Sequence, residues 1–278
     1  MPAPEMRFPA SHCRVLSIAA PERKVTIIHA TNTALVAWAP SYLAEALGFY
    51  HDEGFAIERV SSGSGPASVT ALISGSGTSV LNPPGELLVA VARGLGLKII
   101  MAQANYQTLH LVISKQFAER HWVAEGMPIR ERLAAAQNFK GFRCGITAPG
   151  SSTDYAARAA FKSAGLDPVA DVQILPLGST PSALAAMRNG NIDGFTAASP
   201  APEMAKLQFG AMIYFSVGRD EIPGFKPMAG QVVGVRNADI EKGPDLYAAL
   251  VRADVKAMRY IIQEPRAAGE TLQKARYE

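Results

Sequence analysis

The sequence predicts an α/β protein built from two Rossmann-like lobes, with mostly parallel sheets and a ligand cleft between the lobes. Two observations predict this fold class. The segment 66–75 recurs at 181–190, in a constant register of 115 residues. In each half, β-rich runs alternate with helical stretches, which is typical of parallel sheets that carry helices on both faces. A duplicated α/β unit indicates two similar lobes, and the space between such lobes suits a ligand.

The elements of the first half follow from local patterns. They are a strand at 25–30, a helix at 35–47, a strand at 56–60, a helix at 66–74, an apolar helical stretch after the loop at 82–84, and a strand at 97–100. The segment 31–33 contains residues that cap helices, and the first helix is expected to end at Gly48. Pro66 fits a first helical turn, where its missing N–H is not needed.

The second half repeats this order. It predicts a strand at 142–147, a helix at 154–163, a strand at 172–175, a helix from 181, and a strand at 211–215 after the loop at 199–202. The segment 151–153 supplies hydroxyl side chains that cap the first of these helices, and Gly165 ends it.

Two further β-rich runs, 109–113 and 231–235, connect the halves and are interpreted as the hinge. An amphipathic helix at 246–263 follows and is interrupted by Pro265. The predicted domains are lobe I at 24–110 plus 216–278 and lobe II at 111–215. Residues 1–23 are predicted to be a poorly ordered lead-in.

Composition excludes several classes of protein. Apolar residues make up 48% of the chain and charged residues 18%, so a packed core is expected rather than disorder. The net charge is +3 and no Lys/Arg cluster is interleaved with aromatic residues, so no nucleic-acid partner is predicted. Two distant cysteines, Cys13 and Cys144, do not indicate a metal site, and Cys144 is expected to be buried and inert.

The N-terminal region leaves the compartment open. No apolar run reaches the ~20 residues that span a bilayer. The run 15–20 follows two arginines but is shorter than the usual apolar core of a signal peptide. Export by a signal outside this start and a cytosolic location both remain compatible with the sequence.

A family resemblance rests on three motifs. The stretch 39–58, which contains Pro-x-Tyr and an aromatic pair after Gly48, resembles the signature of the nitrate/sulfonate/taurine class of ABC-importer substrate-binding proteins. The segments 149–153 and 188–194 are similar to two further motifs of that class. The resemblance covers about 24–262. It implies the type II periplasmic binding fold, hinge closure on a ligand, a permease and an ATPase as partners, and a periplasmic or cell-envelope location.

The same fold also serves thiamine-pyrimidine synthases and sensors, so an alternative is a cytosolic enzyme that acts on a cofactor precursor. The chain departs from the importer pattern in its weak export signal, in a C-terminus that looks short, and in the Gly77–Thr78 pair where Gly-x-x-Asp is expected. The cysteine-rich motif of the yeast-type pyrimidine synthases is absent, which counts against that enzyme. A sensor domain would need a fused output module.

The sequence carries none of three common catalytic motifs. The sequence contains no Gly-x-Ser-x-Gly elbow, no His-Glu-x-x-His and no phosphate-binding Gly-x-x-x-x-Gly-Lys, so no catalytic residue, no metal and no cofactor are predicted. The carboxylates of Asp154 and Asp193 are each explained by a structural position, in a helix first turn and in a turn.

Helix N-termini predict the chemistry of the site. Unpaired N–H groups and a partial positive charge allow several such termini to bind an anion without arginine. The predicted ligand is therefore a small anionic organic molecule, held by a monomer. By position within the resemblance, the expected ligand-binding residues are Asn32, Trp38, Ser62, Asn82, Ser151, Ser152, Thr153 and Ser199. Alternative roles remain open: Ser151 to Thr153 as helix caps, Asn82 as a turn residue, and Trp38 in the core.

Overall fold

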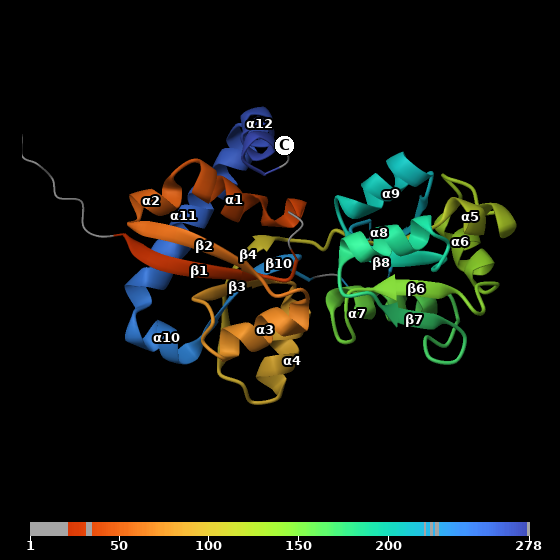
Figure 1. Ribbon diagram of the computed structural model, residues 1–278, viewed down its shortest axis with the longest axis horizontal. Coiled ribbons are helices and arrows are strands. Elements are labelled where there is room, and N and C mark those ends of the chain that lie inside the picture. The colour runs from red at the N-terminus through yellow and green to blue at the C-terminus, as the bar shows by residue number, and fades with distance from the viewer. Residues whose placement is uncertain (1–21, 32–34, 220, 223–224, 226–227, 277–278) are drawn as a thin grey trace, which may run out of the picture.

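The computed structural model describes residues 22–31, 35–219, 221–222, 225 and 228–276. Within them lie two five-stranded sheets, each covered by helices, and Figure 1 shows the two sheets in separate lobes that lie side by side. We call the lobe with β1 the first lobe and the lobe with β6 the second lobe. The predicted α/β class with mostly parallel sheets is confirmed.

The first sheet has the order β2-β1-β3-β10-β4. Its strands are β1 (Arg23–His29), β2 (Phe55–Ser61), β3 (Ser79–Asn82), β4 (Leu97–Ala104) and β10 (Gln231–Arg236). β1 pairs in parallel with β2 and β3, whereas β10 runs antiparallel to β3 and β4. The antiparallel strand is the segment that returns from the second lobe.

The second sheet has the order β7-β6-β8-β5-β9 and repeats this plan. Its strands are β5 (Leu109–Ile113), β6 (Arg143–Ile146), β7 (Gln173–Pro176), β8 (Gly194–Ala198) and β9 (Met212–Ser216). β6 is parallel to β7 and β8, and β5 is antiparallel to β8 and β9. Each sheet thus contains one reversed strand, and each reversed strand directly follows a crossing between the lobes.

The helices cover both faces of each sheet. Those of the first lobe are the short η1 (Val36–Trp38), α1 (Ala39–Ala46), α2 (Phe49–Asp52), α3 (Gly65–Ile73), α4 (Pro84–Ala92), α10 (Asn237–Lys242), α11 (Pro244–Gln263) and α12 (Pro265–Arg276). Those of the second lobe are α5 (Lys115–Arg120), α6 (Ile129–Ala136), α7 (Ser152–Ser163), α8 (Thr180–Arg188) and α9 (Ala201–Phe209).

The sequence repeat becomes a structural repeat. α3 and α8 have nine residues each and start 115 positions apart, at Gly65 and Thr180. Their N-caps, Ser64 and Ser179, keep the same spacing, and each side chain accepts a hydrogen bond from the backbone N–H three residues on. A serine cap followed by a proline in the first turn fixes the start of both helices.

Alternation along the strands places a core on each side of each sheet. In β1, Ile27 packs toward α1 and α11, and its neighbour Ile28 packs toward α3 and α4. In β5, Leu111 packs into the core on one side of the second sheet, and its neighbour Val112 packs into the core on the other side. Cys144 is fully buried in β6, as expected, and burial raises its pKa to about 12.

The sequence patterns missed several short elements. No strand was predicted at 79–82, which forms β3 with four buried residues, and Asn82 at its end was expected in a loop. α2, β8, α5, α6, α10 and α12 were also not expected, and the helix predicted at 35–47 is divided into η1 and α1. Apart from α12, which has 12 residues, the unexpected elements are runs of four to eight residues, too short for helical or strand periodicity to be distinct.

Of the helices in the described part of the chain, none combines the length and the apolar character needed to cross a membrane.

Candidate ligand-binding site

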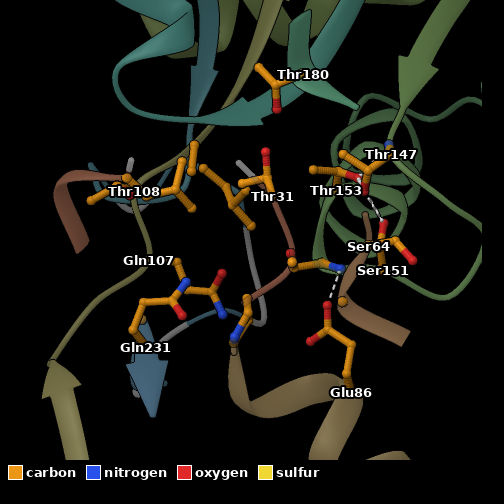
Figure 2. A pocket seen from close by; sticks show the side chains of 18 of the residues that line it. Thr31, Ser64, Glu86, Gln107, Thr108, Thr147, Ser151, Thr153, Thr180 and Gln231 are labelled. Carbon is orange, nitrogen blue, oxygen red and sulfur yellow. Dashed lines mark hydrogen bonds between the residues drawn. The ribbon is translucent and has the colours of Figure 1, made fainter. Parts of the chain in front are cut away.

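A cavity of about 60 Å³ lies between the two lobes, and both lobes line it. The first lobe contributes the loop that follows β1, the N-terminal ends of α3 and α4, and Trp38. The second lobe contributes the N-terminal ends of α7 and α8 and the end of β8. Both crossing segments also reach it, through Gln107, Thr108 and Gln231 (Figure 2). The predicted ligand cleft therefore has a counterpart in the structure.

The second-lobe wall is built around the N-terminus of α7. Ser151 is the N-cap, and its Oγ accepts a hydrogen bond of 3.3 Å from the backbone N–H of Asp154. The hydroxyls of Ser151 and Thr153 lie 2.7 Å apart, and Thr153 Oγ1 accepts from the backbone N–H of Thr147. Figure 2 shows these three side chains together on one side of the cavity. Hydroxyls that already bond each other form a preorganised polar surface.

One hydrogen bond joins the two lobes inside this site. Glu86, in the first turn of α4, accepts at Oε1 from the backbone N–H of Ser152, over 2.8 Å (Figure 2). Its other oxygen, Oε2, is buried and has no hydrogen-bond partner among the described residues. The carboxyl thus occupies the N-terminal end of α7, where the helix dipole favours a negative group.

The first-lobe wall is aromatic and amide in character. Trp38 is buried, and its Nε1 donates to Oε1 of Gln231 over 3.2 Å. The ring of Trp38 also lies 5.0 Å from that of His29, measured between centroids. Because Gln231 begins β10 while Trp38 precedes α1, this bond fixes the returning strand to the cavity wall.

The structure brings four of the eight residues expected from the sequence to the cavity: Trp38, Ser151, Ser152 and Thr153. Three others lie outside its lining. Ser62 donates to the backbone oxygens of His29 and Ser64, and Ser199 donates to Glu203. Asn82 is fully buried, and its amide bonds Ser68 and the backbone oxygen of Gly65. Asn32 lies outside the described residues. Ligand contact by these eight residues stays a prediction.

The sequence analysis did not select Glu86, Gln107, Thr180 or Gln231. An acid in the first turn of a helix is ordinarily a response to the helix dipole, so Glu86 gave no distinct signal. Gln107 lies between β4 and β5, and Gln231 is the first residue of the predicted hinge run 231–235. A polar residue in or beside a predicted hinge is the one pattern that could have indicated them. Thr180 lies 115 residues after Gly65 and is its equivalent in the repeat. Because the loop at Gly65 was considered as part of the site, the repeat could have indicated Thr180.

Asp154 and Asp193, the two carboxylates that could suggest catalysis, have structural partners. Asp154 accepts from the backbone N–H of Gly150 and pairs with Arg158, and Asp193 pairs with Arg143 through both carboxylate oxygens. Despite partial burial, which acts the other way, the hydrogen bonds from Arg143 lower the pKa of Asp193. The structural roles expected for these residues are confirmed.

The electrostatics of the cavity depend on Glu86. Among the described residues of the lining, it alone can carry a charge, since no Lys, Arg or His contributes. Burial raises its pKa to about 7, against the opposing effect of hydrogen bonds that include the one from Ser152. In the part of the chain that the structure describes, no three His, Cys, Asp or Glu side chains gather as a metal site would require.

The fold matches those of known substrate-binding proteins. The alkanesulfonate-binding protein SsuA from Xanthomonas axonopodis pv. citri, bound to MOPS, superposes with a TM-score of 0.70 at 17% identity, over 92% of this chain and 80% of that chain. The periplasmic aliphatic sulphonate binding protein SsuA from Escherichia coli gives a TM-score of 0.66 at 20% identity, over 92% of this chain and 79% of that chain. The periplasmic-binding-protein architecture expected from the sequence is confirmed.

Sequence comparison gives the family. The bicarbonate-binding protein CmpA of Synechococcus elongatus is 23% identical over 245 residues, which cover 81% of this chain and 52% of CmpA. The chain therefore spans about half the length of that curated relative. The resemblance to the nitrate/sulfonate class of ABC-importer substrate-binding proteins is confirmed by these relatives. A family model matches residues 20–274, and the chain belongs to the NMT1-like family.

Proposed function

We propose that this protein is the solute-binding component of an ABC importer, and that it captures a small organic molecule in the cavity between its lobes. The observation that carries the proposal is the cavity itself, whose walls come from both lobes and are joined by the hydrogen bond from Ser152 to Glu86. A ligand that touches both walls makes all its contacts only when the lobes are together, so binding favours the closed form.

The lobes are the bodies that move in this proposal. The sequence predicts their boundaries as 24–110 with 216–278 and 111–215. Because β5 (Leu109–Ile113) and β9 (Met212–Ser216) are whole strands of the second sheet, we place the boundaries just before β5 and just after β9. The chain crosses between the sheets after β4 and again after β9, and residues of both crossings line the cavity. Closure about these two crossings would therefore change the cavity directly. The closed monomer would dock on a membrane permease driven by an ATPase, in the periplasm or cell envelope.

The ligand is released unchanged in this proposal. The hydroxyls of Ser151 and Thr153 are engaged in helix capping and in bonds with Thr147, rather than with a base that would activate them. The sequence predicts that the solute is anionic. The helix N-termini of α3, α7 and α8 at the cavity support that prediction, whereas the carboxyl of Glu86 opposes it.

Thermal unfolding against a panel of sulfonates, carboxylates, nitrate, bicarbonate and pyrimidines tests the proposal. A ligand at 100 times its Kd stabilises the folded state by about 2.7 kcal/mol, which raises Tm by a few degrees. Mass spectrometry of the recovered compound distinguishes binding from catalysis, and small-angle scattering measures closure. A compound recovered in altered form would contradict the binding role and favour the enzyme alternative.

A further inference from the structure

Glu86 lines the cavity between the lobes and has one buried carboxyl oxygen without a hydrogen-bond partner among the described residues. As a whole, Glu86 is 5% exposed. Oε1 is used by the backbone N–H of Ser152, and Oε2 has no partner among the described residues. A buried acceptor without a hydrogen bond costs free energy, and a donor that reaches it recovers that cost.

The N-terminus of α7, which would attract an anionic ligand, already holds the carboxyl of Glu86. The first free N–H of α7 points at the Glu86 carboxyl rather than at open space. An anionic ligand at that position would have to displace this carboxyl and would lie beside it, with no cationic side chain among the described lining residues to offset the repulsion. A ligand that donates a hydrogen bond meets neither difficulty.

We infer that Oε2 of Glu86 accepts a hydrogen bond from the ligand, and that the site selects solutes with an N–H or O–H donor, such as a primary amide, a sulfonamide or an amine, over the matching acid anions. This inference rests on the proposed solute-binding function of the same cavity. It names a ligand chemistry different from the anion expected from the sequence, because that expectation counted the helix termini without the carboxyl that one of them holds.

The titration of Glu86 gives the inference a second readout. Burial raises the pKa of Glu86 to about 7, so the carboxyl changes charge near neutral pH. Tyr155 of α7 and Arg93 at the end of α4 line a neighbouring pocket together with Glu86, and burial raises the pKa of Tyr155, as do the carboxylates of Glu86 and Asp154. An ionised carboxylate is the better acceptor, so the affinity for a donor ligand rises between pH 6 and pH 8, and the affinity for an anion falls.

Pairs of probes matched in size test the inference directly. The pairs are acetamide with acetate, methanesulfonamide with methanesulfonate, and benzamide with benzoate, each titrated calorimetrically and by thermal unfolding at pH 6 and pH 8. In the wild-type protein at pH 8, we expect each amide to bind about tenfold more tightly than its acid, since hydrogen bonds to charged groups are the strong ones.

Glu86→Gln is the decisive variant. Its amide oxygen can still accept from Ser152, and its NH₂ group then takes the position of Oε2, so an acceptor becomes a donor without a change of shape. We expect the preference within each pair to shift toward the acid and to lose its dependence on pH. Glu131→Gln is the matched control, because Glu131 is an exposed first-turn acid of α6 and its loss changes the net charge equally.

The outcomes are distinct. Acids that bind the wild-type protein more tightly than amides, with no change in Glu86→Gln, would overturn the inference and leave the solute-binding function standing. Binding of no probe at any concentration would contradict both. If Glu86→Gln does not fold, Gly65→Ala serves in its place, because an added Cβ would lie 2.5 Å from Oε1 and would move the carboxyl while keeping its charge. In Gly65→Ala, we expect each amide and its matching acid to bind with nearly equal affinity.

Discussion

The carboxyl of Glu86 accepts a hydrogen bond of 2.8 Å from the backbone N–H of Ser152, and this bond joins α4 of the first lobe to the start of α7 in the second. A side chain of one lobe thus occupies the helix end of the other. The contact has two consequences: it stabilises the arrangement in which the lobes meet, and it holds a carboxyl in the wall of the cavity.

Ser152→Pro should remove the bond between the lobes and leave α7 intact. Ser152 is the first residue of the helix, where proline is well tolerated, and Ser151 has the extended backbone that a following proline requires, with φ −82° and ψ 165°. Without the N–H, Glu86 loses its partner and the two lobes separate more readily. Small-angle scattering of the ligand-free protein should show a larger radius of gyration. An unchanged radius with an unchanged Tm would show that the bond does not hold the lobes together.

Gly65→Ala and Gly85→Ala form a matched pair. A Cβ at Gly65 would lie 2.5 Å from Oε1 of Glu86, whereas a Cβ at Gly85 would meet the ring of Tyr155 at an ordinary 3.5 Å. Gly65→Ala should displace the carboxyl and reduce ligand affinity about tenfold, the value of one charged hydrogen bond. Gly85→Ala should keep the affinity and raise the free energy of unfolding by about 0.5–1 kcal/mol, because alanine favours a helix over glycine. Equal affinities in the two variants would contradict the role of the carboxyl's position.

Trp38→Phe should weaken binding through Gln231. The substitution keeps an aromatic ring but removes the Nε1–H that donates to Gln231 Oε1, so a buried acceptor loses its partner. We expect a loss of about 1–3 kcal/mol in the free energy of unfolding and a fall in ligand affinity, measured by urea unfolding and calorimetry. Tyr247→Phe is the control, because its hydroxyl bonds Thr78 in another part of the first lobe. A loss of stability without any loss of affinity would place Trp38 in the core alone.

Asp254 should make stability depend on pH in the acid range. It is 1% exposed, accepts from the hydroxyl of Tyr50 over 2.6 Å, and burial raises its pKa to about 6. Because this pKa exceeds the unfolded value, the folded state binds the extra proton, and the contribution of Asp254 to stability falls as pH rises from about 4 to above 6. In the wild-type protein, Asp254 should lower the free energy of unfolding by roughly 2–3 kcal/mol between pH 4.5 and pH 7.5, and Asp254→Asn should abolish this difference, as measured by urea unfolding at the two pH values. Parallel pH curves for the two proteins would show that Asp254 does not titrate in this way.

Local sequence determined the repeated framework. A serine cap, a proline in the first turn and a glycine 11 residues beyond the cap specify α3 and α8 by themselves, and the structure places these helices at equivalent positions in the two lobes. The strands at 109–113 and 231–235 were also readable, because these β-rich runs have no helical periodicity. We interpreted them as the hinge, whereas each lies inside a sheet as its reversed strand and the chain crosses between the lobes just before it. These features depend on neighbours in the chain, which sequence reasoning can evaluate.

The same reasoning found one wall of the cavity. Ser151, Ser152 and Thr153 follow a strand and begin a helix, so their position at the carboxyl end of a parallel sheet could be expected. Asn82 was expected there on similar grounds. It ends β3, but its amide turns inward to Ser68 and Gly65, and nothing local to the sequence Asn-Pro-Pro distinguishes an inward from an outward amide.

Only the tertiary structure decided what the cavity contains. Glu86 and Ser152 are 66 residues apart in the chain and belong to different lobes, so their bond depends on how the lobes pack. That packing also buries the carboxyl, and burial raises its pKa. The sequence alone therefore determined two lobes, a cleft and helix termini that attract anions. The long-range packing decided that one terminus is already occupied, since desolvation and hydrogen bonding act between groups that only the fold brings together.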